Sequence, residues 1–224
     1  MSFRSAVLSL AIVGAACGGC TTNPPLDTVP AVDLNRFQGQ WFEIAHIPRP
    51  TQADCTATTA TYTRTSPTAM TLVHQCYVGG PSGPLRQVAA NAIVPDAAST
   101  AKLSVDFGGF YGDYWIIDLG KDYDYAVIGH PSRDYLWLLS RTPTLDDATL
   151  AGMKARAQEK GFDVSRLELT RRDGAAAPPP PSADVKPASY GCSMQATQGT
   201  PPFALILAAV ATFLARRRRG ATSR

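Results

Sequence analysis

The sequence has few of the residues and motifs that commonly mark an enzyme active site. Its 224 residues include three histidines, and no His-Glu-x-x-His zinc motif is present. A Gly-x-Ser-x-Gly nucleophile turn and a Gly-rich phosphate loop are also absent. These absences argue against a zinc protease, a serine hydrolase and a nucleotide-binding enzyme. We therefore expect no catalytic residue, no metal site and no cofactor.

A long hydrophobic run is missing as well. Residues 203–215 would form about 20 Å of helix, which is short of the roughly 30 Å hydrocarbon core of a membrane.

The excess of positive charge is confined to the two ends, where six of the 21 lysines and arginines lie. The rest of the chain carries 15 basic and 18 acidic groups, a net charge of −3. It therefore offers no electrostatic footprint for nucleic acid.

The N-terminus has the layout of a secretory signal, in which Arg4 precedes a short apolar stretch and then small residues. The segment Gly14-Ala15-Ala16-Cys17 resembles a bacterial lipobox, in which the cysteine is acylated and becomes the mature N-terminus, and Cys20 is a second candidate. An ordinary signal peptide cleaved after a small residue is the alternative. We expect residues 1–20 to be the export signal and residues 21–32 to be a tether. Lipoprotein acylation would anchor the protein firmly, because two or more chains hold stably in a membrane.

The C-terminal residues carry a second sorting pattern. Residues 173–190 include four consecutive prolines, which predict an extended, polyproline-like linker. Gly191-Cys192, the apolar run and a cluster of four arginines follow in the segment 191–224. This order resembles the myxobacterial C-terminal sorting signal, which is cut near the cysteine and leaves the protein at the cell surface. A permanent single-span anchor with its arginines on the cytoplasmic side is the alternative.

Residues 33–172 have the pattern of one β-rich domain. Eight segments rich in aromatic, aliphatic and β-branched residues follow one another at intervals of about 8 to 14 residues, which is typical of an antiparallel sandwich or barrel. They are residues 41–46, 58–64, 70–78, 85–94, 102–107, 112–119, 125–130 and 136–140. A ninth strand is expected within residues 162–170. No alternation of strands and helices is present, so a doubly wound fold is not indicated.

Two helical elements, one short and one longer, accompany these strands. Asp33 can cap a helical turn before the first strand. A longer helix is expected after the last barrel strand, with Thr144 or Asp146 as its cap and Gly161 as its end. Its apolar stripe at helical spacing would pack against the outside of the barrel. The members of this stripe are Leu145, Leu150, Met153 and Ala157.

Two of the five cysteines stand at opposite ends of a predicted hairpin. Cys55 precedes the strand 58–64, and Cys76 lies in the returning strand 70–78. Disulfides persist in exported proteins, so we expect a bond between them. Their register is a few residues from ideal cross-strand pairing, which requires a bulge or a twist. Two free buried thiols are the alternative.

Four segments, taken in order, resemble the motifs of the lipocalin family, in particular its bacterial outer-membrane and apolipoprotein D-like members. They are Gly39-Gln40-Trp41, the Phe-Gly-Gly-Phe-Tyr-Gly-Asp-Tyr segment 107–114, the acidic and aromatic segment 122–127, and residues 134–143 with Ser140-Arg141-Thr142-Pro143. The resemblance implies an all-β fold with one flanking helix, namely an eight-stranded antiparallel up-and-down barrel. It also implies that Trp41 closes the barrel floor, that Arg141 stacks over its indole, and that Gly39 allows the sharp entry into the first strand.

The resemblance further implies a function. The resemblance is to bacterial lipocalins that bind fatty acids, lysophospholipids or related amphiphiles. Each buried methylene of an acyl chain would stabilise such a complex by about 0.8 kcal/mol. It implies an exported protein held at the outer membrane or the cell surface. Residues near the open end of the cup are candidates for ligand contact, although each would otherwise pack in the core or on the outer face. They are Tyr62, Phe107, Phe110, Tyr111, Tyr114, Ile116 and Trp137.

Three other interpretations remain open at this point. The first is a surface-displayed interaction module whose barrel is filled by side chains. The second is a thiol enzyme that uses an unpaired Cys55 or Cys76 as its nucleophile. The third is a haem protein with His74 or His130 as the iron ligand, for which a solvent-exposed hairpin or loop histidine is the simpler interpretation.

Overall fold

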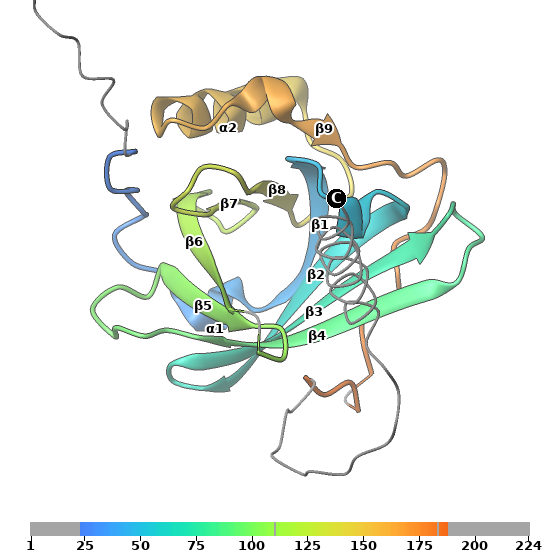
Figure 1. Ribbon diagram of the computed structural model, residues 1–224, viewed down its shortest axis with the longest axis horizontal. Helices are drawn as coiled ribbons and strands as arrows, with labels where there is room; N and C mark the ends of the chain where they lie inside the picture. Colours follow the sequence, from blue (N-terminus) through green and yellow to red (C-terminus); the bar gives the residue numbers. More distant parts are fainter. Residues whose placement is uncertain (1–22, 110, 183, 188–224) are drawn as a thin grey trace, which may run out of the picture. The chain divides into compact units, whose positions relative to one another are not determined.

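Nine strands form one antiparallel sheet that closes on itself in the computed structural model (Figure 1). The structure describes residues 23–109, 111–182 and 184–187. The expected acylation sites Cys17 and Cys20, and the expected sorting motif Gly191-Cys192, lie outside these residues.

The barrel follows an up-and-down order in which each strand from the first to the seventh pairs with the next one in the chain. The strands are β1 (Gly39–His46), β2 (Cys55–Ser66), β3 (Ala69–Val78), β4 (Leu85–Ile93), β5 (Lys102–Asp106), β6 (Tyr111–Leu119), β7 (Tyr125–Gly129), β8 (Leu136–Ser140) and β9 (Glu168–Leu169). β1 pairs with both β2 and β8, which closes the barrel. The eight-stranded antiparallel barrel predicted from the sequence is confirmed.

Short helical elements lie at the start of the barrel, in its first loop and outside its wall. They are α1 (Leu34–Phe37), η1 (Pro50–Gln52), α2 (Asp147–Glu159) and η2 (Val164–Arg166). Asp33 caps α1 by accepting the Asn35 N–H, and Asp146 caps α2 by accepting the Thr149 N–H at 2.8 Å. The predicted caps are therefore confirmed. Within the described ranges, no helix combines the length and the apolar character needed to cross a membrane.

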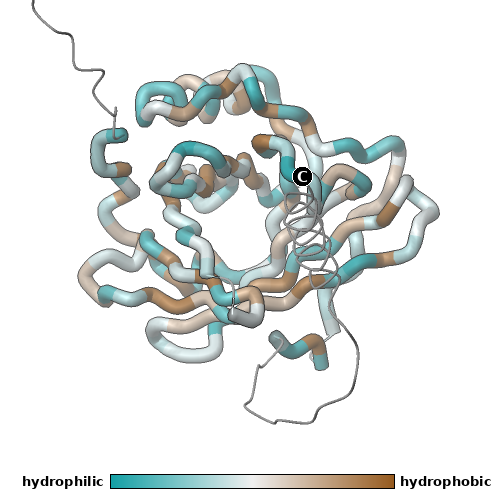
Figure 2. The backbone as a smooth tube through the Cα atoms, viewed as in Figure 1, coloured by the Kyte–Doolittle hydropathy of each residue, from teal (hydrophilic) through white to brown (hydrophobic). Residues whose placement is uncertain are grey.

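The apolar side chains form two layers, because successive strand residues point to opposite faces of the barrel wall. Apolar and polar residues are interspersed along the strands (Figure 2). One layer fills the barrel and includes Trp41, Leu72 and Ile116. The other lies between the wall and α2, where Met153 and Ala157 are fully buried. The predicted helix stripe is confirmed, and the buried side chains of α2 belong to the outer layer.

The expected strand over residues 162–170 is largely absent. Asp163 accepts a hydrogen bond from the Ser165 N–H and begins η2, so the chain turns before it can pair. β9 is left with two residues, which pair with Ala45 and His46 of β1. The hydrogen bond from the backbone to the Asp163 side chain therefore favours a turn over the strand that the following apolar residues predicted.

Part of the Pro-rich linker lies against the barrel. Residues 173–182 contain no helix or strand. Pro178 is buried, and its carbonyl accepts a hydrogen bond of 3.1 Å from the Gln40 side chain. The start of the linker is thus held on the domain and is not a free spacer along its whole length.

Candidate functional site

One end of the barrel is closed by an aromatic cluster. Trp41 is fully buried, and its indole N–H donates to the Phe37 carbonyl at 2.8 Å. The Phe37 ring, carried by α1, lies 5.0 Å from the Trp41 ring. The guanidinium carbon of Arg141 lies 3.7 Å from the centroid of the Trp41 ring, which places the cation on the indole face.

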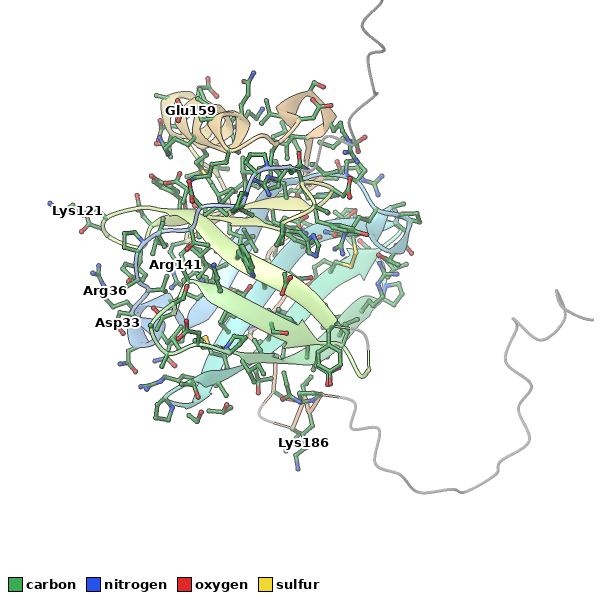
Figure 3. All side chains as sticks on the ribbon, turned by 60° about the vertical axis from the view of Figure 1, so that its left-hand side comes forward. Asp33, Arg36, Lys121, Arg141, Glu159 and Lys186 are labelled. Atoms are coloured by element: carbon green, nitrogen blue, oxygen red, sulfur yellow. A yellow bond between two sulfur atoms is a disulfide. The ribbon has the colours of Figure 1, made fainter. Side chains whose placement is uncertain are left out.

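Arg141 also binds the backbone of the segments that meet at this end. Its guanidinium donates to five carbonyls, those of Arg36, Phe37, Gln38, Gln40 and Tyr123. Figure 3 shows Arg141 beside Arg36 and Asp33. Burial lowers the pKa of Arg141 to about 10, so the side chain stays charged at neutral pH. Gly39 has φ +100°, and a Cβ there would lie 3.2 Å from the Arg141 guanidinium.

The opposite end opens into a cavity of about 370 Å³, which is within the range of small-molecule sites. The loops after β1, β3, β5 and β7 surround this end, since those strands all run toward it. The cavity wall includes Thr58 of β2, His74 of β3 and Tyr114 of β6. Phe107, directly after β5, completes an aromatic side of the cavity.

Below this cavity the barrel is almost filled. A second space of about 10 Å³ lies among Tyr62, His74, Tyr114 and Trp137, and it is about large enough for one water molecule. Tyr114 stacks on Trp137 with 4.8 Å between the ring centroids. The cup is therefore shallow as it stands, and a long chain would reach the floor only if these aromatic side chains moved.

Two titratable groups of the wall, His74 and Tyr114, are neutral at neutral pH. Burial lowers the pKa of His74 to about 4, and the nearby Arg49 adds to this effect while Glu43 opposes it. Burial raises the pKa of Tyr114 to about 12, with Arg49 opposing the rise. The aromatic wall of the open cavity is therefore uncharged, and the charged residues of its lining are Arg49 and Arg86.

A chain of polar contacts links Arg49 to a buried carboxylate. Arg49 Nη2 donates to Gln52 Oε1 at 2.9 Å, and Gln52 Nε2 donates to both carboxylate oxygens of Glu43 at 2.8 Å. Glu43 also accepts from Thr170 Oγ1 and lies 3.0 Å from His46 Nδ1. Burial by itself would raise the pKa of Glu43, but the hydrogen bond with His46, together with those from Thr170 and Gln52, outweighs it and holds the pKa below its usual value.

Cys55 and Cys76 form a disulfide at the edge of the cavity, with their Cα atoms 5.4 Å apart. The pairing of β2 and β3 shifts register between Thr56 and Thr59, and Ala57 in this bulge has φ 54°. The predicted disulfide and its bulge are both confirmed. Neither sulfur is free to act as a nucleophile, so the structure does not support the thiol enzyme.

Four of the seven residues expected to contact ligand border the two spaces. Phe107 and Tyr114 line the larger cavity, and Tyr62, Tyr114 and Trp137 line the smaller one. Ile116 is fully buried in the barrel core and borders neither space. Contact with a ligand stays a prediction for each of them.

The remaining two expected residues are placed differently. Tyr111 is 73% exposed, because the alternation of β6 turns it away from the face that carries Tyr114. The structure therefore does not bring Tyr111 to the cavity. Phe110 lies outside the described residues.

Sequence reasoning missed two cavity residues and misjudged a third. His74 was expected in solvent, but it shares the inner face of β3 with the buried Leu72 and Cys76 and lines the cup. The alternation of β3 was a signal that could have placed it. Arg49 and Gln52 lie in an irregular loop, where no periodic pattern points to them. His130 is a loop histidine as expected, although it is only partly exposed, with Nδ1 2.9 Å from Ser132 Oγ.

A closed antiparallel barrel with one sealed end and one open apolar end is a small-molecule-binding cup. A family model described as a lipocalin-like domain matches residues 32–172. This chain belongs to the lipocalin family.

Individual relatives agree with this assignment. The chain is 34% identical over 170 residues to the outer membrane lipoprotein Blc of Escherichia coli (strain K12), covering 75% of this chain and 96% of that protein. It is 31% identical over 176 residues to temperature-induced lipocalin-1 of Arabidopsis thaliana, covering 75% and 91%. Among solved structures, insecticyanin from the tobacco hornworm Manduca sexta has a TM-score of 0.55 at 21% identity, covering 69% of this chain and 88% of that one. The likeness to insecticyanin concerns the fold alone.

Proposed function

We propose that this protein is a lipid-binding lipocalin of the bacterial envelope that binds or stores fatty acids, lysophospholipids or similar small amphiphiles. The cavity of about 370 Å³ at the open end carries this proposal. Its aromatic side, formed by Phe107 and Tyr114, suits an apolar chain, while its entrance is open to water for a polar head. The sealed floor at Trp41 and Arg141 leaves one end for entry.

We propose binding and not catalysis. The two cysteines at the cavity edge are joined to each other. Glu43 is held by Gln52, Thr170 and His46, which leaves it engaged in the barrel wall. These groups stabilise the cup, and none is paired with a second group as a nucleophile is paired with its base.

We also propose export and membrane attachment. A relative that this chain matches over 75% of its length is named an outer membrane lipoprotein, and the sequence has a lipobox-like segment at Cys17. The domain limits 33–172, the linker 173–190 and the sorting segment 191–224 are part of this proposal. Mass spectrometry of the protein from its own host measures acylation at Cys17 or Cys20 and cleavage near Cys192. An unmodified, full-length chain would contradict both processing steps.

Displacement of a fluorescent fatty acid tests the binding function. We expect palmitate and a lysophospholipid to displace it at one molecule per cup. Val88 borders the cavity, whereas Ile93 on the same strand lies outside it with a similar exposure of 48% against 45%. Val88→Trp should therefore weaken binding, and Ile93→Trp should not. Absence of displacement in the unaltered protein would favour the interaction module with a filled barrel.

A further inference from the structure

Three residues that line the open cavity have a buried polar atom without a hydrogen-bond partner. One atom is Gln75 Oε1, an acceptor, and the other two can donate. These two are Arg49 Nε, on the loop after β1, and His74 Nε2, on β3. Both residues line the same cavity. Buried polar groups in folded proteins nearly always have a partner, because an unmade hydrogen bond costs free energy. A ligand that brings acceptor atoms to this place would supply the partner that these two donors lack.

Arg49 also lacks a neighbouring counter-charge. Within the described ranges, no carboxylate lies within ion-pairing distance of its guanidinium. Gln52 stands between Arg49 and Glu43, and its amide takes up both carboxylate oxygens. The charge of Glu43 is thus held away from Arg49 by a neutral spacer.

A second arginine of the cavity lining is arranged in the opposite way. Arg86 forms an ion pair with Asp54, with 2.7 Å between Nη2 and Oδ1. It also reaches the disulfide, 2.9 Å from Cys55 Sγ. Arg86 therefore braces the loop and the disulfide, and its charge is already matched.

The position of Arg49 is set by aromatic stacking. Its guanidinium carbon lies 4.8 Å from the centroid of the Trp137 ring and 5.9 Å from that of Tyr135. A guanidinium held on an aromatic face keeps its N–H groups at the ring edge, available to an anion in the same plane. Phe107, on the aromatic side, lines the same cavity.

We propose that Arg49 is the anion-recognition residue of the cup, and that the bound amphiphile carries a carboxylate or a phosphate at the end of one acyl chain. The guanidinium receives the anionic head, and the chain lies against Phe107 and Tyr114. His74 provides a second polar contact to the head. This inference rests on the proposed lipid-binding function and adds the charge of the ligand and the residue that recognises it.

Competition against a neutral apolar dye such as Nile red tests the inference, since the dye itself carries no anionic head. Palmitate is compared with hexadecanol, and lysophosphatidic acid with monoacylglycerol, so that carboxylate and phosphate are tested separately against neutral partners. We expect at least one acid to bind about ten- to a hundredfold more tightly than its neutral partner, as for a charge-assisted hydrogen bond. The acid with the larger preference identifies the headgroup.

Substitutions assign this preference to one arginine. Arg49→Gln should remove the preference for the acid and leave the affinity for the neutral amphiphile unchanged, which also shows that the variant is folded. Arg49→Lys should keep part of the preference, because it retains the charge without the fork of donors. Arg86→Gln is the matched control and should keep the whole preference.

The outcomes separate this inference from the function on which it rests. Equal binding of both acids and their neutral partners would overturn the inference and leave the lipid-binding function in place. The same holds for a preference that survives in Arg49→Gln or disappears in Arg86→Gln. If no amphiphile displaces the dye, the lipid-binding function fails and the inference fails with it.

Discussion

The two ends of this barrel hold an arginine over a tryptophan in nearly the same way, yet the two arginines differ in what surrounds them. At the closed end, Arg141 lies over Trp41 and its donors reach five backbone carbonyls. At the open end, Arg49 lies over Trp137, one donor reaches Gln52, and Nε has no partner. The stacking alone does not distinguish structure from function. The satisfaction of the remaining donors does, and it marks the open end as the place where a ligand completes the site.

The largest expected effect separates the ends by their contribution to stability. Trp41→Ala should lower the free energy of unfolding by about 3 to 5 kcal/mol, because it removes a large buried aromatic and leaves a cavity. Phe107→Ala, at the partly buried open end, should cost less than half of that. Urea denaturation of both variants measures the difference. Equal losses would mean that the open end is packed as a second floor and is not a binding cavity.

The two arginines should also differ in their contribution to stability, with the larger contribution at the closed end. Arg141→Gln removes most of the contacts to five carbonyls and should cost about 3 kcal/mol, as expected for the loss of charged hydrogen bonds. Arg49→Gln should change the free energy of unfolding by less than about 1 kcal/mol, because little of its hydrogen bonding is satisfied in the absence of ligand. Denaturation curves without lipid test this pair. A loss at Arg49 as large as that at Arg141 would identify both as structural.

The sequence made the closed end predictable because its parts lie in regular strands and in contiguous motifs. Gly39 and Trp41 are in one motif, and Arg141 follows the last barrel strand directly. The open end depends on a loop, and no periodic pattern placed Arg49 or Gln52 there. His74 is an intermediate case: strand alternation places it inside the cup, whereas the sequence interpretation took it for a solvent-exposed hairpin histidine. The failed strand at 162–170 has a different cause, since Asp163 capped a turn that the apolar pattern did not reveal.

The pH dependence of stability gives a further contrast, because His74 is held neutral while Arg141 stays charged. His74 has a pKa of about 4 in the folded protein, against an ordinary value of 6.5. The folded state therefore binds fewer protons than the unfolded state between these values. Stability is fully present above about pH 6.5 and falls as the pH drops toward 4. The expected loss from His74 between pH 7 and 4.5 is about 2 to 3 kcal/mol.

Two histidine variants assign this loss. Arg49 adds to the shift in the pKa of His74, and Glu43 opposes it. The experiment therefore substitutes the histidines alone and keeps Arg49 and Glu43. The lowered pKa of Glu43 adds a loss of stability at still lower pH. His74→Gln should flatten the stability profile between pH 7 and 4.5, and His130→Gln, in the partly exposed loop after β7, is the comparison variant. An unaltered profile in His74→Gln would show that His74 exchanges its proton as freely as a histidine in water.

The smallest expected difference concerns the backbone at each end. Gly39, at the closed end, has φ +100°, and a Cβ there would lie 3.2 Å from Arg141 Nη1. Gly79, after β3 at the open end, has φ +79° with no atom within 4 Å of such a Cβ. Alanine at Gly79 should cost about 1 kcal/mol from backbone strain alone. Alanine at Gly39 should cost more than this, because the new methyl group also displaces the guanidinium from Trp41 and from its carbonyls. Tryptophan fluorescence measured with the denaturation curve reports that displacement, and equal costs at the two glycines would show that the closed end accommodates the methyl group without losing its stack.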